Sequence, residues 1–118
     1  MPITGLLITM NESEYLLVLC TCPPGKAAEH LAQSLVERKL AACVNITRPV
    51  LSIYRWKDSL EKDEEALLYI KTHTASWSAL EQAILELHPY DLPEIIALPL
   101  ARGNQHYLNW VGENLCAD

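Results

Sequence analysis

The sequence has no long apolar run and comparatively few basic residues. No stretch approaches the roughly 20 apolar residues that a membrane-spanning helix needs, so we expect no membrane partner. Lys and Arg number 9 against 15 Asp and Glu, which gives a net charge of -6. Because nucleic-acid binding depends on clustered basic side chains, this balance argues against a nucleic-acid partner. An acidic surface instead tolerates or attracts cations.

The first residues also lack the marks of a secretory signal. Residues 1–14 have no basic leading region, and Glu12 and Glu14 interrupt the apolar stretch. Without export, the cysteines are expected to remain reduced thiols. We therefore expect a cytoplasmic protein, in which an N-terminal extension over 1–14 precedes a single domain over 15–118.

Apolar patterning predicts an alternation of strands and helices. Strands are expected over 15–22, 41–56, 64–72 and 94–100, and helices over 24–40, 75–88 and 104–115. This order is typical of the ferredoxin-like βαββαβ unit, an α+β fold with two helices on one face of a four-stranded antiparallel sheet. The last helix is then a short C-terminal addition. Pro49 indicates an edge or a bulge within its strand, and the charged residues 57–63 are expected at a hairpin tip.

The strands are apolar on both faces. A sheet that is covered by helices on one face alone would instead alternate apolar and polar residues. Side chains alternate between the two faces of a strand. Leu16 and Val18 therefore share one face of the first strand, while Leu17 and Leu19 share the other. A single chain would expose the second face as an apolar patch larger than soluble monomers usually show. We therefore expect an oligomer that buries these faces together.

The same topology brings chemically active side chains to one edge of the sheet. The first strand ends at Cys20 and Cys22, and the second helix ends at His88, just before the residues Tyr90, Asp91 and Glu94. A thiolate and an imidazole together suit Cu(I), Cu(II) or Zn(II). Simpler roles are equally available, because free cysteine is often buried and a histidine can stabilise a helix C-terminus.

Catalytic and phosphate-binding alternatives have weaker support. Cys22 and His88 can be paired as nucleophile and base, although only Asp91 or Glu94 would be available to orient the imidazole. Residues 23–30, "PPGKAAEH", place one glycine and one lysine at a helix start, far from a full phosphate-binding motif. Stacking aromatics for RNA are missing from the central strands, so we reject that use of the fold.

Four segments resemble, in order and spacing, the CutA family of divalent-cation-tolerance proteins. They are "LCTCPPGKAAEHLAQSLVERKLAACVNI", "SIYRWKDSLEKDEEALLYIKT", "HPYDLPEIIALPL" and "YLNW". The resemblance implies a ferredoxin-like fold, a very stable homotrimer and binding of divalent cations, chiefly copper (Cu²⁺), with Zn²⁺ as a further candidate. It places the metal-binding residues at Cys20 and His88. Some members carry a second histidine where this chain has Leu87, which leaves open whether Cys22 replaces that ligand.

The resemblance also implies a cleft between subunits, lined by Trp56, Lys71, Tyr90 and Glu94. The structural alternatives are interface packing for Trp56 and an ion pair between Lys71 and Glu94. The leading hypothesis is a cytoplasmic, trimeric, metal-binding protein that is not an enzyme. The alternative is a signalling module like the P-II trimers, which bind small effectors between subunits; an enzyme using the same cleft is a third, weaker option.

Overall fold

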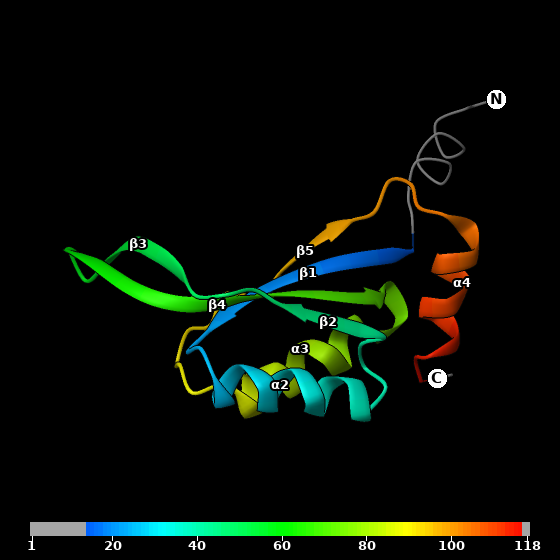
Figure 1. Ribbon diagram of the computed structural model, residues 1–118, viewed down its shortest axis with the longest axis horizontal. Helices are drawn as coiled ribbons and strands as arrows, with labels where there is room; N and C mark the ends of the chain where they lie inside the picture. Colours follow the sequence, from blue (N-terminus) through cyan, green and yellow to red (C-terminus); the bar gives the residue numbers. More distant parts are fainter. Residues whose placement is uncertain (1–13, 117–118) are drawn as a thin grey trace.

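The structure is a computed structural model that describes residues 14–116, so the expected extension over 1–14 lies almost wholly outside the described residues. Strands and helices alternate along the chain (Figure 1). The strands are β1 (Tyr15–Cys22), β2 (Cys43–Ile46), β3 (Val50–Trp56), β4 (Ser59–His73) and β5 (Ile96–Pro99); the helices are α2 (Lys26–Glu37), α3 (Trp77–Leu87) and α4 (Gln105–Glu113), with a 3-10 turn, η1, at Thr74–Ser76.

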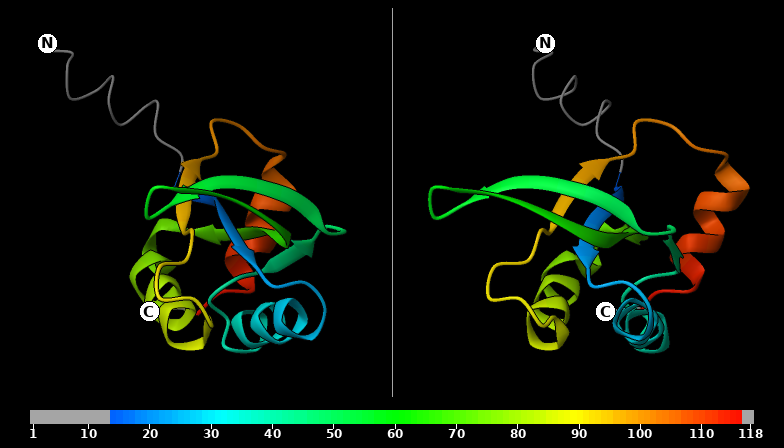
Figure 2. Two further views of the ribbon diagram at one scale, coloured as in Figure 1. Left: turned by 90° about the vertical axis from the view of Figure 1, so that its left-hand side faces the viewer. Right: turned by 60° about the vertical axis from the view of Figure 1, so that its left-hand side comes forward.

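The strands form one antiparallel sheet in the order β2-β4-β1-β5, and β3 pairs with the far half of β4. The helices α2 and α3 lie side by side beneath one face of this sheet, and α4 lies at its end (Figures 1 and 2). The α+β class and the placement of the two main helices are therefore as predicted. The sheet, however, has five strands instead of four.

The extra strand arises because the predicted strand over 41–56 breaks between Ile46 and Val50. Pro49 has no N–H to donate to the ladder, so it cannot continue the pairing. Two hydrogen bonds of Thr47 fix the chain between β2 and β3. Its N–H donates to Leu67 O at 3.0 Å, and its Oγ1 accepts from Leu67 N at 3.0 Å. The hydroxyl thus takes over a backbone bond that a continuous strand would have made.

The hairpin tip is much shorter than predicted. Only Lys57 and Asp58 form the turn, and both have positive φ angles, of 49° and 69°. A turn with two such residues matches the twist of the flanking strands, so pairing continues directly from Ser59 to Trp56. Strand β4 consequently reaches 15 residues and projects with β3 beyond the rest of the sheet (Figure 1). We call β3 together with residues 59–65 the arm.

The arm makes the chain elongated. The radius of gyration is 16.1 Å, whereas a compact domain of this length is expected near roughly 13–14 Å. Three apolar side chains of the arm are more than half exposed: Leu51 at 62%, Ile53 at 58% and Leu60 at 67%. The arm is therefore held by its hairpin pairing and not by burial in the core of its own chain.

The main core lies between the sheet and the two helices. Val18 and Leu68 face Leu35 of α2 and Leu80 of α3, and all four side chains are fully buried. The opposite face of the sheet has no helix over it among residues 14–116 (Figure 1). Ile96 and Leu98 on that face are 52% and 44% exposed. Within the same described residues, no helix is long and apolar enough to cross a membrane.

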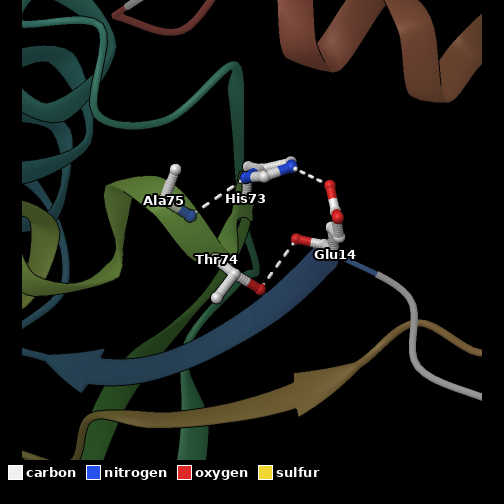
Figure 3. A network of polar contacts seen from close by, with 4 residues as sticks. All are labelled: Glu14, His73, Thr74 and Ala75. Atoms are coloured by element: carbon white, nitrogen blue, oxygen red, sulfur yellow. Dashed lines mark hydrogen bonds and ion pairs between the residues drawn. The ribbon is translucent and has the colours of Figure 1, made fainter. Parts of the chain in front are cut away.

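The start of β1 is tied to the end of β4 by a polar network (Figure 3). The carbonyl of Glu14 accepts from the N–H and the hydroxyl of Thr74, at 2.7 and 2.9 Å. Ala75 N donates to His73 Nδ1 at 2.9 Å, and His73 Nε2 lies 3.1 Å from Glu14 Oε1. Because Nδ1 accepts, Nε2 carries the proton and donates to the carboxylate. This network secures the end of the sheet remote from His88.

We expect Leu80→Ala to lower the free energy of unfolding by about 2–5 kcal/mol, because Leu80 is fully buried between helix and sheet. Leu85→Ala is the matched control on the same helix, since Leu85 is 48% exposed, and should cost less than about 1 kcal/mol. Urea unfolding at one fixed protein concentration measures both. Equal losses would contradict the assigned core.

Candidate functional site

His88 is placed by the end of α3. The residue before a proline is forced out of the helical region, and His88 is accordingly extended, with φ -77° and ψ 137°. Its buried ring reaches the C-terminal end of β1, where Nε2 lies 2.7 Å from Thr21 O. The predicted meeting of the first strand's end with His88 is therefore confirmed.

Both ring nitrogens of His88 are occupied. The N–H of Tyr90 donates to Nδ1 at 3.1 Å, so Nδ1 carries a lone pair and the ring is neutral. Nε2 must then carry the hydrogen and donate to Thr21 O. This imidazole joins the loop after α3 to β1, and neither nitrogen is free for another ligand.

Cys20 and Cys22 face the helices and belong to the main core. Their exposed fractions are 0% and 1%. Burial is the main cause that raises the pKa of the Cys20 thiol from 9.0 to about 12, and electrostatic repulsion from Cys22, Glu94 and Glu65 adds to it. Burial and Glu65 raise the pKa of Cys22 to about 11. Both cysteines are therefore protonated thiols at neutral pH.

Cys20 and His88 do not fit a copper ion as they stand. To bind copper, a cysteine must be a thiolate and a histidine must have a free ring nitrogen, whereas here the thiols hold their protons and both ring nitrogens are bonded. Leu87, where a second histidine would stand, packs against the core. Across residues 14–116, no three His, Cys, Asp or Glu side chains are grouped as they would be around a metal ion. The role of Cys20 and His88 as ligands stays a prediction, and it requires a rearrangement.

A cleft of about 700 Å³ lies between the arm and the loop that follows His88. It is lined by Thr21 of β1, by Ser52, Ile53, Tyr54, Arg55 and Trp56 of β3, by Asp63 and Glu65 of β4, and by Tyr90, Asp91, Leu92 and Glu94 of the loop. Three of the residues predicted for a cleft, Trp56, Tyr90 and Glu94, are therefore brought together. The β1 end, with Thr21, connects this cleft to His88.

Glu65 is the most buried acid of the cleft. Its exposed fraction is 7%, and its Oε2 accepts a hydrogen bond from the Tyr90 hydroxyl at 3.0 Å. Burial and this bond raise the pKa of Tyr90 to about 12, so the phenol keeps its proton. The Tyr90 ring also lies against His88, with ring centres 4.8 Å apart. A continuous set of contacts thus runs from β1 through His88 and Tyr90 to Glu65.

The cleft is strongly acidic. Among residues 14–116, its lining includes four carboxylates, from Asp63, Glu65, Asp91 and Glu94, and one guanidinium, from Arg55. Tyr54 donates a hydrogen bond to Asp63 Oδ2, and this bond is the main reason that the pKa of Tyr54 is raised to about 12. Four negative groups around one hollow concentrate a negative potential, which attracts cations and repels anions.

Lys71 lies outside the cleft of its own chain. It stands opposite Leu17 in the sheet, and its Nζ contacts Asn45 Oδ1 and lies 4.0 Å from Cys43 Sγ. It lies six positions along β4 from Glu65, a distance of about 20 Å. Within one chain, the suggested ion pair with Glu94 is therefore not formed. Among residues 14–116, Arg38 and Glu86 form an ion pair, whereas the neutral His73 donates a hydrogen bond to Glu14.

Sequence reasoning missed Glu65, Asp63 and Tyr54. Residues 57–63 were assigned to a turn, which removed Asp63 from any strand face. A signal for Glu65 was nevertheless present, because the alternation of β4 places it on the same face as Leu67 and Tyr69. An acid in register with an apolar strand face is expected to have a partner, and that partner is Tyr90.

The core position of Cys20 and Cys22 predicts thiols that do not react in the folded protein. In a Cys43→Ser/Cys116→Ser variant, only these two thiols remain. We expect negligible reaction with a disulfide reagent at pH 8, because the thiolate is the reactive form and both pKa values lie well above 8. Two thiols should react after denaturation. Rapid reaction of either thiol in the native protein would show an open site at the end of β1.

Comparisons with known proteins match most of this chain to one family. The family model described as CutA1 divalent ion tolerance protein matches residues 16–114. A divalent-cation tolerance protein CutA from Thermus thermophilus is 48% identical over 98 residues, covering 83% of this chain and 95% of that protein. A CutA homolog from Xenopus laevis is 50% identical over 93 residues, which make up 79% of this chain but 62% of that relative. The match to human Protein CutA covers 51% of the human protein.

Solved structures match over nearly the same range. The Thermus thermophilus Cut A1 structure superposes with a TM-score of 0.84 at 46% identity, covering 86% of this chain and 99% of that one. The CutA1 structure from Oryza sativa gives a TM-score of 0.86 at 38% identity, with 92% and 99% covered. Relatives carry different compartments in their names, chloroplastic in Arabidopsis thaliana and periplasmic in Archaeoglobus fulgidus. By its sequence and its fold, the chain belongs to the CutA1 divalent ion tolerance family.

Proposed function

We propose that this chain forms a cytoplasmic homotrimer that binds divalent cations, copper among them, and serves cation tolerance without catalysing a reaction. The proposed binding region is the acidic cleft. The observation that carries this proposal is Glu65, a nearly buried carboxylate held by Tyr90 in a cleft that has three further acids. Carboxylates held in this way attract a cation before any ligand rearrangement.

Copper is the proposed ion because Cu²⁺ binds most tightly among the divalent first-row metals to a given set of donors, with Zn²⁺ behind it. The carboxylates of the cleft are available without deprotonating a buried thiol. In this proposal Cys20 and Cys22 serve the core and His88 positions Tyr90. In this proposal, water or a neighbouring chain completes the ion's shell, since no three His, Cys, Asp or Glu side chains within residues 14–116 are grouped as a metal site.

Trimer formation is supported by the uncovered apolar surfaces. The sheet face that carries Ile96 and Leu98 and the arm that carries Leu51, Ile53 and Leu60 expose more apolar side chain than a soluble monomer usually does. Packing three copies together would bury both. The strand order, with β2 and β3 taken as one broken strand, supports describing the unit as ferredoxin-like.

A non-catalytic role is supported by the protonated thiol of Cys22, the candidate nucleophile. A Cys22–His88 pair would need a reactive thiolate and a free imidazole nitrogen. Cys22 is buried with a pKa of about 11, and both nitrogens of His88 are bonded. The P-II-like alternative needs Lys71, Tyr90 and Glu94 in one cleft between subunits. Within residues 14–116 of one chain, Lys71 lies away from the cleft, so this alternative requires a neighbouring chain to supply it.

Copper titration tests the cleft. We expect Glu65→Gln to weaken Cu²⁺ binding about tenfold, because it removes a charged donor at the base of the cleft. Glu64→Gln is the matched control: it changes the net charge equally, but Glu64 lies on the other side of β4 and does not line the cleft. Isothermal titration calorimetry measures both. If Cys20→Ser or His88→Ala abolished binding while Glu65→Gln did not, the ion would bind at the β1 end instead.

Light scattering tests the assembly. We expect a particle of about three times the 13.3 kDa chain mass at micromolar concentration. Leu51→Lys combined with Ile53→Lys should reduce the mass, because charged groups would face the buried side of the arm. Val36→Lys, on the exposed side of α2, is the control and should leave the mass unchanged. A wild-type mass of one chain would disprove the trimer.

A further inference from the structure

We propose that Cys43 of β2 and Lys71 of β4 form a covalent cross-link when the protein meets a peroxide. In this link the Cys43 sulfur is bonded directly to the Lys71 side-chain nitrogen, which makes a sulfenamide. Neither residue lines the acidic cleft, so the link is separate from the proposed binding of cations. It makes one edge of the sheet responsive to oxidation.

Cys43 and Lys71 lie directly opposite each other in the sheet. They are 28 positions apart in the chain, yet they are paired in the antiparallel register of β2 and β4. Side chains at such positions point to the same face, with Cβ atoms roughly 4.5–5.5 Å apart. The Lys71 Nζ lies 4.0 Å from the Cys43 Sγ. The backbone pairing therefore holds the two reacting atoms near each other.

Asn45 positions the lysine beside the sulfur. Asn45 is two residues from Cys43, so its side chain lies on the same face of β2. Its Oδ1 accepts a hydrogen bond from Lys71 Nζ and lies 4.0 Å from Cys43 Sγ. The amide oxygen therefore holds the Lys71 side chain over the strand that carries Cys43.

Cys43 differs from the two thiols of the core. Cys20 and Cys22 are sealed between the sheet and the helices, whereas Cys43 is only partly buried. Peroxides oxidise a cysteine through its thiolate, and a neighbouring ammonium stabilises that negative charge. Hydrogen peroxide is little larger than water, and both reacting groups belong to one chain. The reaction therefore does not depend on how much of this face the assembled copies leave open.

The reaction needs a peroxide and no other reactant. The Cys43 sulfur first attacks one oxygen of hydrogen peroxide; the O–O bond breaks, water leaves and a sulfenic acid forms. The Lys71 ammonium then releases a proton to water, and its nitrogen attacks the sulfur. An S–N bond forms, and the hydroxyl leaves the sulfur as a second water with one N–H proton. The sulfur has lost two electrons, which have reduced the peroxide.

The cross-link would tie down an edge strand. Strand β2 has four residues, and among residues 14–116 its neighbour in the sheet is β4. A link across 28 positions restricts the unfolded chain as a disulfide does, which stabilises the linked protein. The link also replaces the Lys71 ammonium by a nitrogen without charge. Oxidation would therefore change both the stability and the charge of the sheet edge.

Peroxide treatment of the whole chain carrying Cys116→Ser tests the proposal, since this substitution removes the exposed thiol and leaves three. We expect the protein to lose two hydrogens in mass and one titratable thiol, and peptide mapping to join the segments that carry Cys43 and Lys71. The linked protein should melt about 5 °C or more above the reduced protein. Dithiothreitol should restore the thiol and the original mass.

Two lysine variants provide the controls. Lys71→Arg keeps a positive charge beside Cys43 but removes the amine, so we expect oxygen to add to the sulfur without a link. Lys62→Arg makes the same change elsewhere on β4 and should form the link as the parent does. A thermal melt of each reduced variant confirms that it is folded.

Several outcomes would overturn the proposal. These are a Cys43 thiol that survives peroxide, or a Cys43 sulfur that gains oxygen while the Lys71 amine stays free in the parent. Equal linking in Lys71→Arg, or a link that maps to Cys20 or Cys22, would do the same. Loss of two thiols together would show a disulfide in place of the sulfenamide.

Discussion

Strands β1 and β4 pair along all eight residues of β1, from Tyr15 opposite His73 to Cys22 opposite Ala66. The location of each functional side chain depends on this register, because neighbouring residues of a strand point to opposite faces. Cys20 and Cys22 face the helices, while Thr21 faces the cleft. Glu65 lies just beyond the paired segment, where β4 leaves β1 and enters the arm. A shift of one residue would exchange thiols and cleft residues between the two faces.

The two sides of the sheet therefore differ in chemistry. The helix side is closed and holds neutral groups, so burial raises the thiol pKa values and favours protonation. The cleft side is open and holds four carboxylates, of which three are exposed and one, Glu65, is nearly buried. His88 joins these regions without being a ligand in either, since its two nitrogens bond the backbone of Thr21 and of Tyr90. Cation binding at the cleft needs no change in the core, whereas binding at Cys20 would require a buried thiol to lose its proton.

Much of the fold could be predicted from the pattern of apolar residues. The main strands and both sheet-covering helices were found because their spacing is strong, and His88 was correctly placed at a helix end because Pro89 follows it. A strand was predicted over 64–72, but the extension of β4 over 59–63 was missed, because these residues have no apolar alternation to indicate a strand. That error also concealed Asp63. Lys71 was assigned to the cleft by resemblance alone, and in the chain it lies beside Asn45 instead.

The order of the elements, an irregularity at Pro49, the apolar character of both sheet faces and the acidic charge could all be predicted from the amino-acid pattern. Each of these depends on local geometry or on composition, which neighbouring residues specify. The three-dimensional packing was needed to show that the thiols are buried in the core, that the arm projects, and that Glu65 contacts Tyr90, 25 positions away in the chain. Burial and long-range hydrogen bonds depend on which distant segments pack together, so no local pattern specifies them.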